Sequence, residues 1–132
     1  MPTPLEQARA ILATQPFSVL LGTDIEEWGD DRAVLSLVVR DEHRQQNGFV
    51  HGGVLAYLVD NAVTFAAATV LGVQVLTAGF TVEYLRPARG PVLLATATVS
   101  GSTRGRAVAR CEVTEGDRVI AIGQGTVSRV GE

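Results

Sequence analysis

Apolar residues run almost without interruption from Gly52 to Leu71, and the only charged residue in this stretch is Asp60. A helix that is apolar on all sides is either enclosed by its own protein or crosses a membrane. A carboxylate near the middle of the stretch would cost roughly 3 kcal/mol on insertion into a bilayer. No Lys or Arg follows within ten residues of Leu71 to anchor that end. The pattern therefore predicts a long, buried central helix with Gly72 as its C-cap.

Alternating apolar and polar positions predict strands on both sides of this helix. Two strand-like runs precede it and four follow it, at residues 19–28, 33–39, 74–86, 92–99, 106–114 and 118–128. Turns rich in Gly and Asp separate several of the runs, including a tight hairpin at residues 115–117. Runs of strands around one helix favour an α+β domain, in which an antiparallel sheet of five or six strands wraps the helix.

The first residues have the composition of a helix start. Thr3 is placed as N-cap, Pro4 as the first helical residue and Glu6 as the partner that completes a capping box. The helix is predicted to be short and amphipathic, and to end at Pro16. The whole chain of 132 residues has the length of one domain, so we expect a single domain over residues 1–132.

Composition narrows the class of protein further. The net charge of −3 provides no basic surface of the kind that binds nucleic acid. The first residues lack the basic start and apolar core of a signal peptide, and the single Cys111 fits a reducing compartment, so a cytoplasmic location is expected. Cys111 lies in a strand-like run and is interpreted as an inert core thiol. No His, Cys and Asp cluster has metal-ligand spacing, so no metal or other cofactor is expected.

The residues that could carry out chemistry lie at the start of the central helix and at one carboxylate within that helix. His51-Gly52-Gly53 has the pattern of a helix mouth, where backbone N–H groups are free and the helix dipole is positive. Two glycines let a ligand approach the backbone closely. Asp60 is a carboxylate in apolar surroundings. An oxyanion donor together with a carboxylate that attacks or acts as a base suits acyl chemistry. The polar loop at residues 40–48 leads directly into His51, so we expect it to belong to the site.

Spacing along the helix constrains how these groups can act together. Gly52 and Asp60 are eight residues apart, which is roughly 12 Å at about 1.5 Å per residue. One carbonyl group cannot touch both in the same chain. If both act on one carbonyl, they must come from different subunits. The spacing therefore predicts a homodimer with two antiparallel central helices and sites shared across the interface.

Three segments resemble one family: Gly48-Phe49-Val50-His51-Gly52-Gly53, Asp60-Asn61-Ala62 and Tyr84-Leu85-Arg86-Pro87-Ala88. Together with the order of elements they resemble the hotdog-fold thioesterases, and within them the phenylacetate-pathway branch of acyl-CoA thioesterases, known as PaaI-like. The resemblance covers about residues 17–128. It implies hydrolysis of an acyl-CoA to a carboxylic acid and free coenzyme A, with coenzyme A present only as part of the substrate. It also implies a homodimer that pairs into a homotetramer.

The resemblance also implies roles for particular residues. Asp60 corresponds to the catalytic carboxylate, as nucleophile or as general base, and Gly52 to the N–H that polarises the thioester carbonyl. His51 would shape and orient the pocket, and Thr77 would hold the attacking water. A polar helper on the carbonyl side would be Gln45 or Asn47. Apart from the resemblance, Arg104 and Arg106 are candidates to bind the phosphates of coenzyme A, with Arg86 and Arg89 as weaker candidates. Gly53 and Tyr84 are candidates to contact the rest of coenzyme A.

Each of these residues also has a purely structural interpretation. Asp60 could cap a loop or bond Asn61, His51 could cap the helix, and Thr77 suits any strand. Arg104 and Arg106 could form a solvated hairpin tip, and Tyr84 could be a core residue. Two other functions remain open on the same fold: a hydratase acting on enoyl-CoA, and a module that binds acyl-CoA without catalysis. The small residues Ala66, Ala67 and Ala68 would leave space for an aromatic or medium-chain acyl group.

Overall fold

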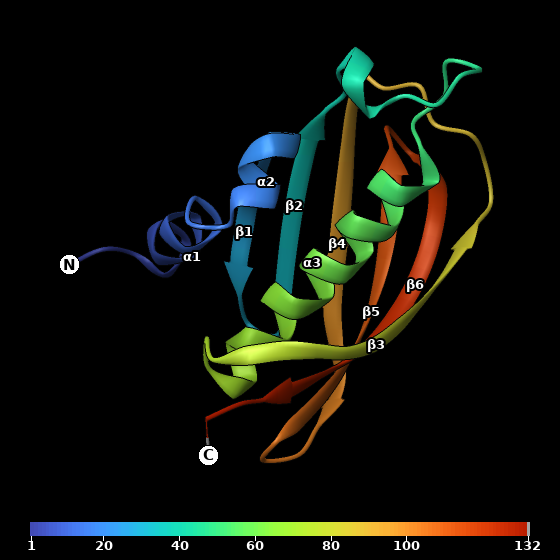
Figure 1. Ribbon diagram of the computed structural model, residues 1–132. Coiled ribbons are helices and arrows are strands. Elements are labelled where there is room, and N and C mark those ends of the chain that lie inside the picture. The colour runs from blue at the N-terminus through green and yellow to red at the C-terminus, as the bar shows by residue number, and fades with distance from the viewer. Residues whose placement is uncertain (132) are drawn as a thin grey trace.

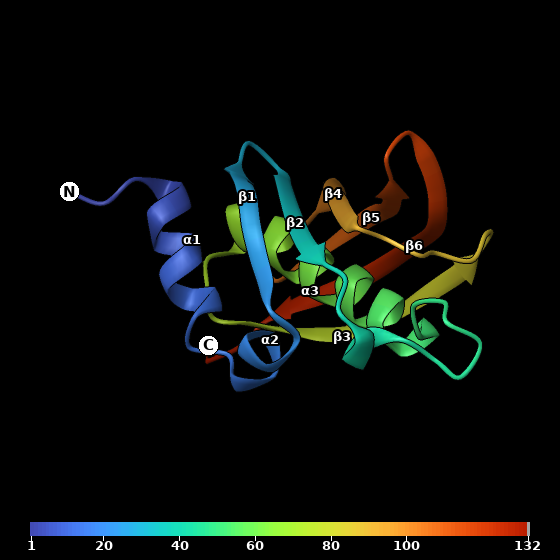
Figure 2. The same cartoon turned by 90° about the horizontal axis from the view of Figure 1, so that it is seen from above.

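A six-stranded antiparallel sheet curls around one long helix in the computed structural model, which describes residues 1–131 (Figures 1 and 2). The strand order is β1-β2-β4-β5-β6-β3. This is the hotdog arrangement expected from the sequence. The elements are α1 (Pro4–Leu12), α2 (Pro16–Leu21), β1 (Thr23–Gly29), β2 (Arg32–Val38), the 3₁₀ turn η1 (Asp41–His43), α3 (Gly52–Leu71), β3 (Val75–Tyr84), β4 (Val92–Ser102), β5 (Arg106–Glu115) and β6 (Arg118–Arg129).

The central helix α3 has the predicted bounds and lies inside the curve of the sheet (Figure 2). By length and composition α3 could also span a membrane, but 67% of its most apolar window is buried by the rest of the fold. Gly72 ends it as C-cap with a φ of 89°. Gly123 and Gly125 of β6 let α3 approach the sheet closely, because a Cβ at Gly123 would lie 2.4 Å from Cγ1 of Val59. The Val59 and Val63 side chains of α3 therefore pack directly on the backbone of β6, where the strand has no side chains.

The N-terminal segment confirms one prediction and corrects another. The Thr3 side chain accepts a hydrogen bond from the Glu6 N–H, and the Glu6 carboxylate accepts one from the Thr3 N–H, which is the predicted capping box. The strand predicted from residue 19 is wrong over its first part. Pro16 instead begins a second helix, α2, which ends at Gly22 with a φ of 82°. Proline is favoured at the first position of a helix, so it marks a start as readily as an end.

β4 is longer than predicted, because it continues to Ser102 through a bulge between Val99 and Gly101. Its partner strand β5 carries Cys111 on the inner face of the sheet. Burial, with a smaller contribution from the nearby Glu112 carboxylate, raises the pKa of the Cys111 thiol to about 12. The thiol is protonated at neutral pH, which supports its interpretation as an inert core residue.

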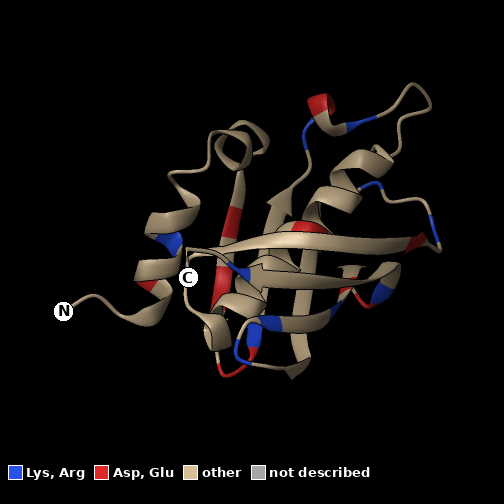
Figure 3. Ribbon diagram, turned by 60° about the horizontal axis from the view of Figure 1, so that its bottom comes forward, with Lys and Arg blue, Asp and Glu red and all other residues tan. Residues whose placement is uncertain are grey.

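The two edges of the sheet differ in how they are protected. β1 carries Asp24, Glu26 and Glu27, has a bulge, and is covered by α1, whose Arg9 donates to the Ile25 carbonyl at 3.0 Å. β3 contains one charged residue, at its far end, and no proline (Figure 3). Within the described chain β3 pairs only with β6. β3 also has a bulge, between Thr77 and Gly79, so the two edges differ in their charge and in the helix that covers β1. Charged residues and a covering helix discourage strands from pairing with other chains. β3 is therefore the edge that is open to a partner.

Candidate functional site

The start of α3 has one backbone N–H that the fold leaves unused. His51 is the N-cap, and its Nδ1 accepts a hydrogen bond from the Gly53 N–H at 2.8 Å. The Gly52 carbonyl accepts from the Tyr84 hydroxyl at 3.0 Å. Among residues 1–131 the Gly52 N–H has no hydrogen-bond partner. A free N–H at the positive end of a helix dipole is suited to bind an oxyanion.

The loop before α3 is fixed by a buried histidine whose structural role was not predicted. His43 is 1% exposed; its Nδ1 accepts from the Arg40 N–H at 2.9 Å, and its Nε2 lies 2.8 Å from the Leu21 carbonyl. The His43 carbonyl in turn accepts from the His51 N–H at 2.8 Å. His43 therefore holds the N-cap residue in place. A histidine in a polar loop gives no sequence signal that it will be buried.

The two candidates for the polar helper lie in different places. Gln45 lines a hollow of about 320 Å³ with Gly52 and Tyr84. Its side-chain oxygen accepts from the Asn47 N–H at 2.5 Å, which leaves the Gln45 amide nitrogen as a donor. The Asn47 residue is exposed and does not line this hollow. The geometry therefore favours Gln45 as the second donor beside Gly52.

The carboxylate of Asp60 is oriented by a chain of hydroxyl groups. Thr77 donates to Oδ1 of Asp60 at 2.6 Å, and its own oxygen lies 2.8 Å from the Thr64 hydroxyl. Thr64 also donates to the Asp60 carbonyl at 2.8 Å. Each threonine has one hydroxyl proton, and Thr77 donates its proton to the Asp60 carboxylate. Thr77 thus holds the carboxylate itself, and Oδ2 of Asp60 is left for a ligand.

The surroundings of Asp60 are less apolar than the sequence suggested. Asp60 is half-buried and opens into a second hollow of about 320 Å³, which Phe17 and Leu76 also line. A polar network lies beside it. In this network the Asn61 amide contacts Gln15, Ser18 and Tyr57, each at 3.2 Å. Half of this network comes from Gln15 and Ser18, which the sequence analysis left at the end of the first helix and just before the first strand. Their contribution was missed because α2 was not predicted.

The two hollows are separate within one copy of the chain. Of the described residues, none lines both the hollow at Gly52 and the hollow at Asp60. Gly52 contacts Tyr84 at one end of β3, and Asp60 contacts Thr77 near the other end. One copy therefore does not bring its own N–H donor and its own carboxylate to the same substrate atom.

The predicted phosphate-binding arginines lie away from both hollows. Arg104 and Arg106 flank Gly105 in the turn between β4 and β5, at the opposite end of the molecule from the start of α3 (Figure 1). Arg106 pairs with Ser128, and its neighbour Ala107 faces the core, so Arg106 faces outward. Arg86, given less weight in the sequence, lines the Gly52 hollow and donates to the Val119 carbonyl at 2.6 Å.

Comparison with known proteins defines the family. Residues 47–122 match the model of the thioesterase superfamily. A candidate esterase from Deinococcus radiodurans is 34% identical over 116 residues, which cover 86% of this chain and 78% of the relative. The chain therefore belongs to the thioesterase superfamily.

Solved structures agree with this assignment. The PaaI protein of E. coli, from the phenylacetic acid degradation operon, is 26% identical with a TM-score of 0.85, over 94% of this chain and 91% of that one. A mutant form of the phenylacetic acid degradation protein PaaI of Thermus thermophilus is 29% identical with a TM-score of 0.81, over 88% of this chain and 100% of that one. These likenesses confirm the hotdog fold and the PaaI-like resemblance drawn from the sequence.

Proposed function

We propose that this protein is an acyl-CoA thioesterase whose sites are shared between two copies of the chain. The observation that carries the proposal is that one copy holds two incomplete half-sites that do not meet. One half-site has the unused Gly52 N–H and the Gln45 amide, and the other has Asp60 with its carboxylate held by Thr77. A helix N-terminal N–H can stabilise the oxyanion that forms when a thioester carbonyl is attacked.

The proposed chemistry needs only these groups and water. Asp60 either takes a proton from water as the water oxygen attacks the thioester carbon, or attacks that carbon directly and is released by water afterwards. In both routes the carbonyl oxygen becomes negative while it is bound by the Gly52 N–H. The carbon–sulfur bond then breaks, and the coenzyme A thiolate leaves and takes up a proton. The hydrogen bond from Thr77 keeps one carboxylate oxygen fixed, so that the other faces the substrate.

The edge strand β3 supports a particular arrangement of the two copies. β3 is ten residues long, has an open edge and exposes Leu76 and Phe80, which are 64% and 38% accessible. Two such edges can pair antiparallel about a two-fold axis. Within one copy Tyr84 contacts Gly52 and Thr77 contacts Asp60, so these two residues of β3 show where the half-sites lie along the strand. Setting the Tyr84 end of one copy beside the Thr77 end of the other centres the two-fold axis in the middle of the strand, near Phe80 and Thr81, and would bring both half-sites together twice.

The coenzyme A end of the substrate is assigned to cationic groups outside the two hollows. In their own copy, Arg104 and Arg106 lie at the opposite end of the molecule from Gly52. An antiparallel arrangement of the two copies would bring these arginines toward the Gly52 end of the partner. Gly53 and Tyr84 lie beside Gly52, where they would contact the pantetheine arm. A homotetramer built from two such dimers remains part of the proposal.

The test is the loss of turnover on removing the carboxylate. We expect Asp60→Asn and Asp60→Ala to lower turnover at least about a hundredfold, measured as release of free thiol from a panel of acyl-CoA esters. Asp117→Asn is the matched control, because Asp117 lies exposed in the β5–β6 turn. Circular dichroism and the melting temperature show that the fold is intact. Near-normal turnover by Asp60→Ala would remove the mechanism, and tight binding of CoA esters without thiol release would identify a binding module instead.

A further inference from the structure

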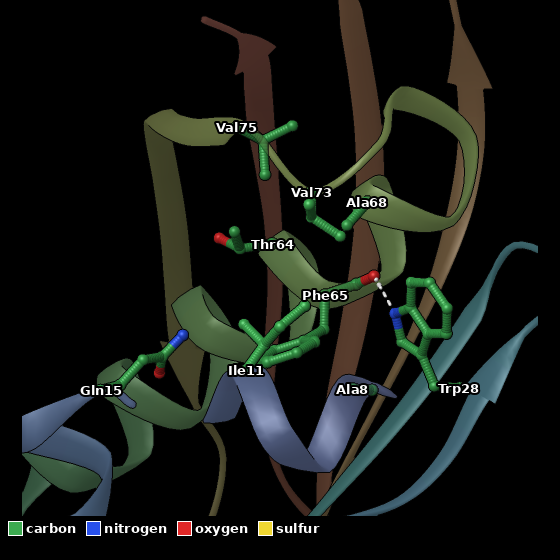
Figure 4. A pocket seen from close by; sticks show the side chains of 9 residues that line it. All are labelled: Ala8, Ile11, Gln15, Trp28, Thr64, Phe65, Ala68, Val73 and Val75. Atoms are coloured by element: carbon green, nitrogen blue, oxygen red, sulfur yellow. Dashed lines mark hydrogen bonds between the residues drawn. The ribbon is translucent and has the colours of Figure 1, made fainter. Parts of the chain in front are cut away.

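A third hollow lies next to the Asp60 site, and the proposed function does not use it. It has a volume of about 90 Å³ and lies between α1, the C-terminal half of α3, the end of β1 and the start of β3 (Figure 4). Most of its wall is apolar. The lining residues are Ala8, Ile11, Gln15, Trp28, Thr64, Phe65, Ala68, Val73 and Val75.

This hollow adjoins the carboxylate. Gln15, Thr64 and Val75 line both it and the hollow that contains Asp60. Thr64 is also the hydroxyl that contacts Thr77 and donates to the Asp60 carbonyl. A group that enters past Asp60 would therefore meet the apolar wall one turn of α3 further along, at Thr64 and then Ala68.

The lining offers little to a polar or charged ligand. None of the nine lining residues is charged. The Trp28 Nε1–H donates to the Phe65 carbonyl at 2.8 Å (Figure 4), and the Thr64 hydroxyl is engaged with Asp60 and Thr77. The Gln15 side-chain oxygen accepts from the Ser18 hydroxyl at 2.6 Å. Placing a charged group in such a site would cost several kcal/mol without a partner.

The size of the hollow restricts what fits. Its volume of about 90 Å³ corresponds to about three water-sized or methylene-sized groups. A longer chain such as hexanoyl would keep its first carbons in the adjoining Asp60 hollow and place its last three here. An apolar cavity known to accept benzene is larger, at about 150 Å³. The indole of Trp28 forms one wall and is fixed by its hydrogen bond to α3, so it limits the length of a chain that enters.

We infer that this hollow binds the acyl group of the substrate, and that the group is a short, uncharged aliphatic chain such as butyryl or hexanoyl. The inference rests on the proposed thioesterase function and adds its specificity. The thioester carbonyl lies at Asp60, the coenzyme A arm leaves toward the other copy, and the acyl chain enters between α1 and α3. Ala68 and Ile11 then set the space that the chain fills.

Two substitutions change this space in opposite directions. Ala68→Leu fills the hollow, and Ile11→Ala enlarges it. Ala10→Leu is the matched control, because Ala10 is exposed on α1 and does not line the hollow. The measurement is kcat/KM for acetyl-, butyryl-, hexanoyl-, decanoyl- and phenylacetyl-CoA with a free-thiol readout. The wild type is expected to prefer butyryl- and hexanoyl-CoA.

The expected result is a shift of chain-length preference rather than a general loss. Ala68→Leu should lower kcat/KM for hexanoyl-CoA about tenfold or more and leave acetyl-CoA within about threefold, since one or two methylene groups change discrimination by such factors. Ile11→Ala should move the preference toward decanoyl-CoA. Equal losses on all substrates in Ala68→Leu, or a wild-type preference for phenylacetyl- or decanoyl-CoA, would overturn the inference while leaving the thioesterase proposal in place.

A protein that hydrolyses none of these esters would contradict the proposed function, and the acyl site would then be tested by binding alone. The probe is S-hexyl-CoA, a thioether that cannot be hydrolysed, titrated by calorimetry into the wild type and Ala68→Leu. At least about tenfold weaker binding by Ala68→Leu, with Ala10→Leu unchanged, supports the acyl site. Equal affinity for the two proteins rules it out.

Discussion

The backbone N–H of Gly52 can be removed without changing the rest of the helix start. Gly52 is the first residue of α3, a position where proline is favoured and where no intrahelical hydrogen bond is lost. His51 has φ −62° and ψ 136°, which is the conformation preferred before proline. A Cβ at Gly52 would lie 3.4 Å from the Tyr84 ring, which is an ordinary contact. Gly52→Pro therefore removes the donor and places the ring Cδ where its hydrogen pointed, while the rest of the helix start is kept.

The expected outcome for Gly52→Pro is a loss of kcat of about 10²–10³, the typical effect of removing one oxyanion donor. Gly52→Ala keeps the N–H and adds the same Cβ, so it should retain turnover within about tenfold. Steady-state kinetics of the two variants, with their melting temperatures, provide the comparison. If Gly52→Pro turned over substrate as fast as Gly52→Ala, the donor role of Gly52 would be wrong.

At the scale of the elements, the close packing of α3 on Gly123 of β6 helps to set the position of Asp60. A Cβ at Gly123 would lie 2.4 Å from Val59 Cγ1 and 2.7 Å from the Thr81 carbonyl, so the backbone would have to shift. We expect Gly123→Ala to lower the free energy of unfolding by about 1–3 kcal/mol, as overpacking of a core does. Gly101→Ala, where a Cβ meets nothing within 4 Å, is the control. Urea unfolding of both variants measures the difference, and equal stability would contradict the close-packing argument.

The elements that the sequence predicted correctly share a strong local signal. The apolar run of α3, the capping box at Thr3 and the hairpin at residues 115–117 are encoded by neighbouring residues. The segment from Pro16 to Leu21 lacks that signal, because a proline followed by apolar residues is compatible with a helix start or with a strand after a break. Val19 and Leu20, which the sequence analysis placed at the start of a strand, are instead exposed residues of α2.

In the candidate site, too, the features encoded by neighbouring residues could be predicted, and those set by contacts between distant residues could not. Gly52 and Asp60 could be proposed from the sequence because their motif is contiguous and unusual. The choice of Gln45 over Asn47, and the burial of His43, depend on how the loop folds back on Leu21 and Phe49. The position of Arg104 and Arg106 depends on the register of β4 with β5. Contacts between residues far apart in the chain set these features, and no local pattern records them.

For the whole molecule, the two edges of the sheet differ in whether they can pair with another chain. The acidic residues and the helix at β1 keep that edge from pairing. The open edge at β3 carries Phe80 on the face toward α3, since its partner Gly125 also faces α3. Pairing two β3 edges would bury these groups and complete both half-sites. The assembly and the activity are therefore expected to depend on the same strand.

Mixing two inactive variants tests this dependence directly. If each site takes Gly52 from one copy and Asp60 from the other, a hybrid of Gly52→Pro and Asp60→Asn has one site with both changes and one site with neither. We expect unfolding and refolding the two variants together at equal concentration to restore about a quarter of wild-type turnover, because half of the dimers are hybrids and each has one intact site. Each variant refolded alone is the control. If both groups acted within one copy, every site would keep one defect, and the mixture would be no more active than the separate variants.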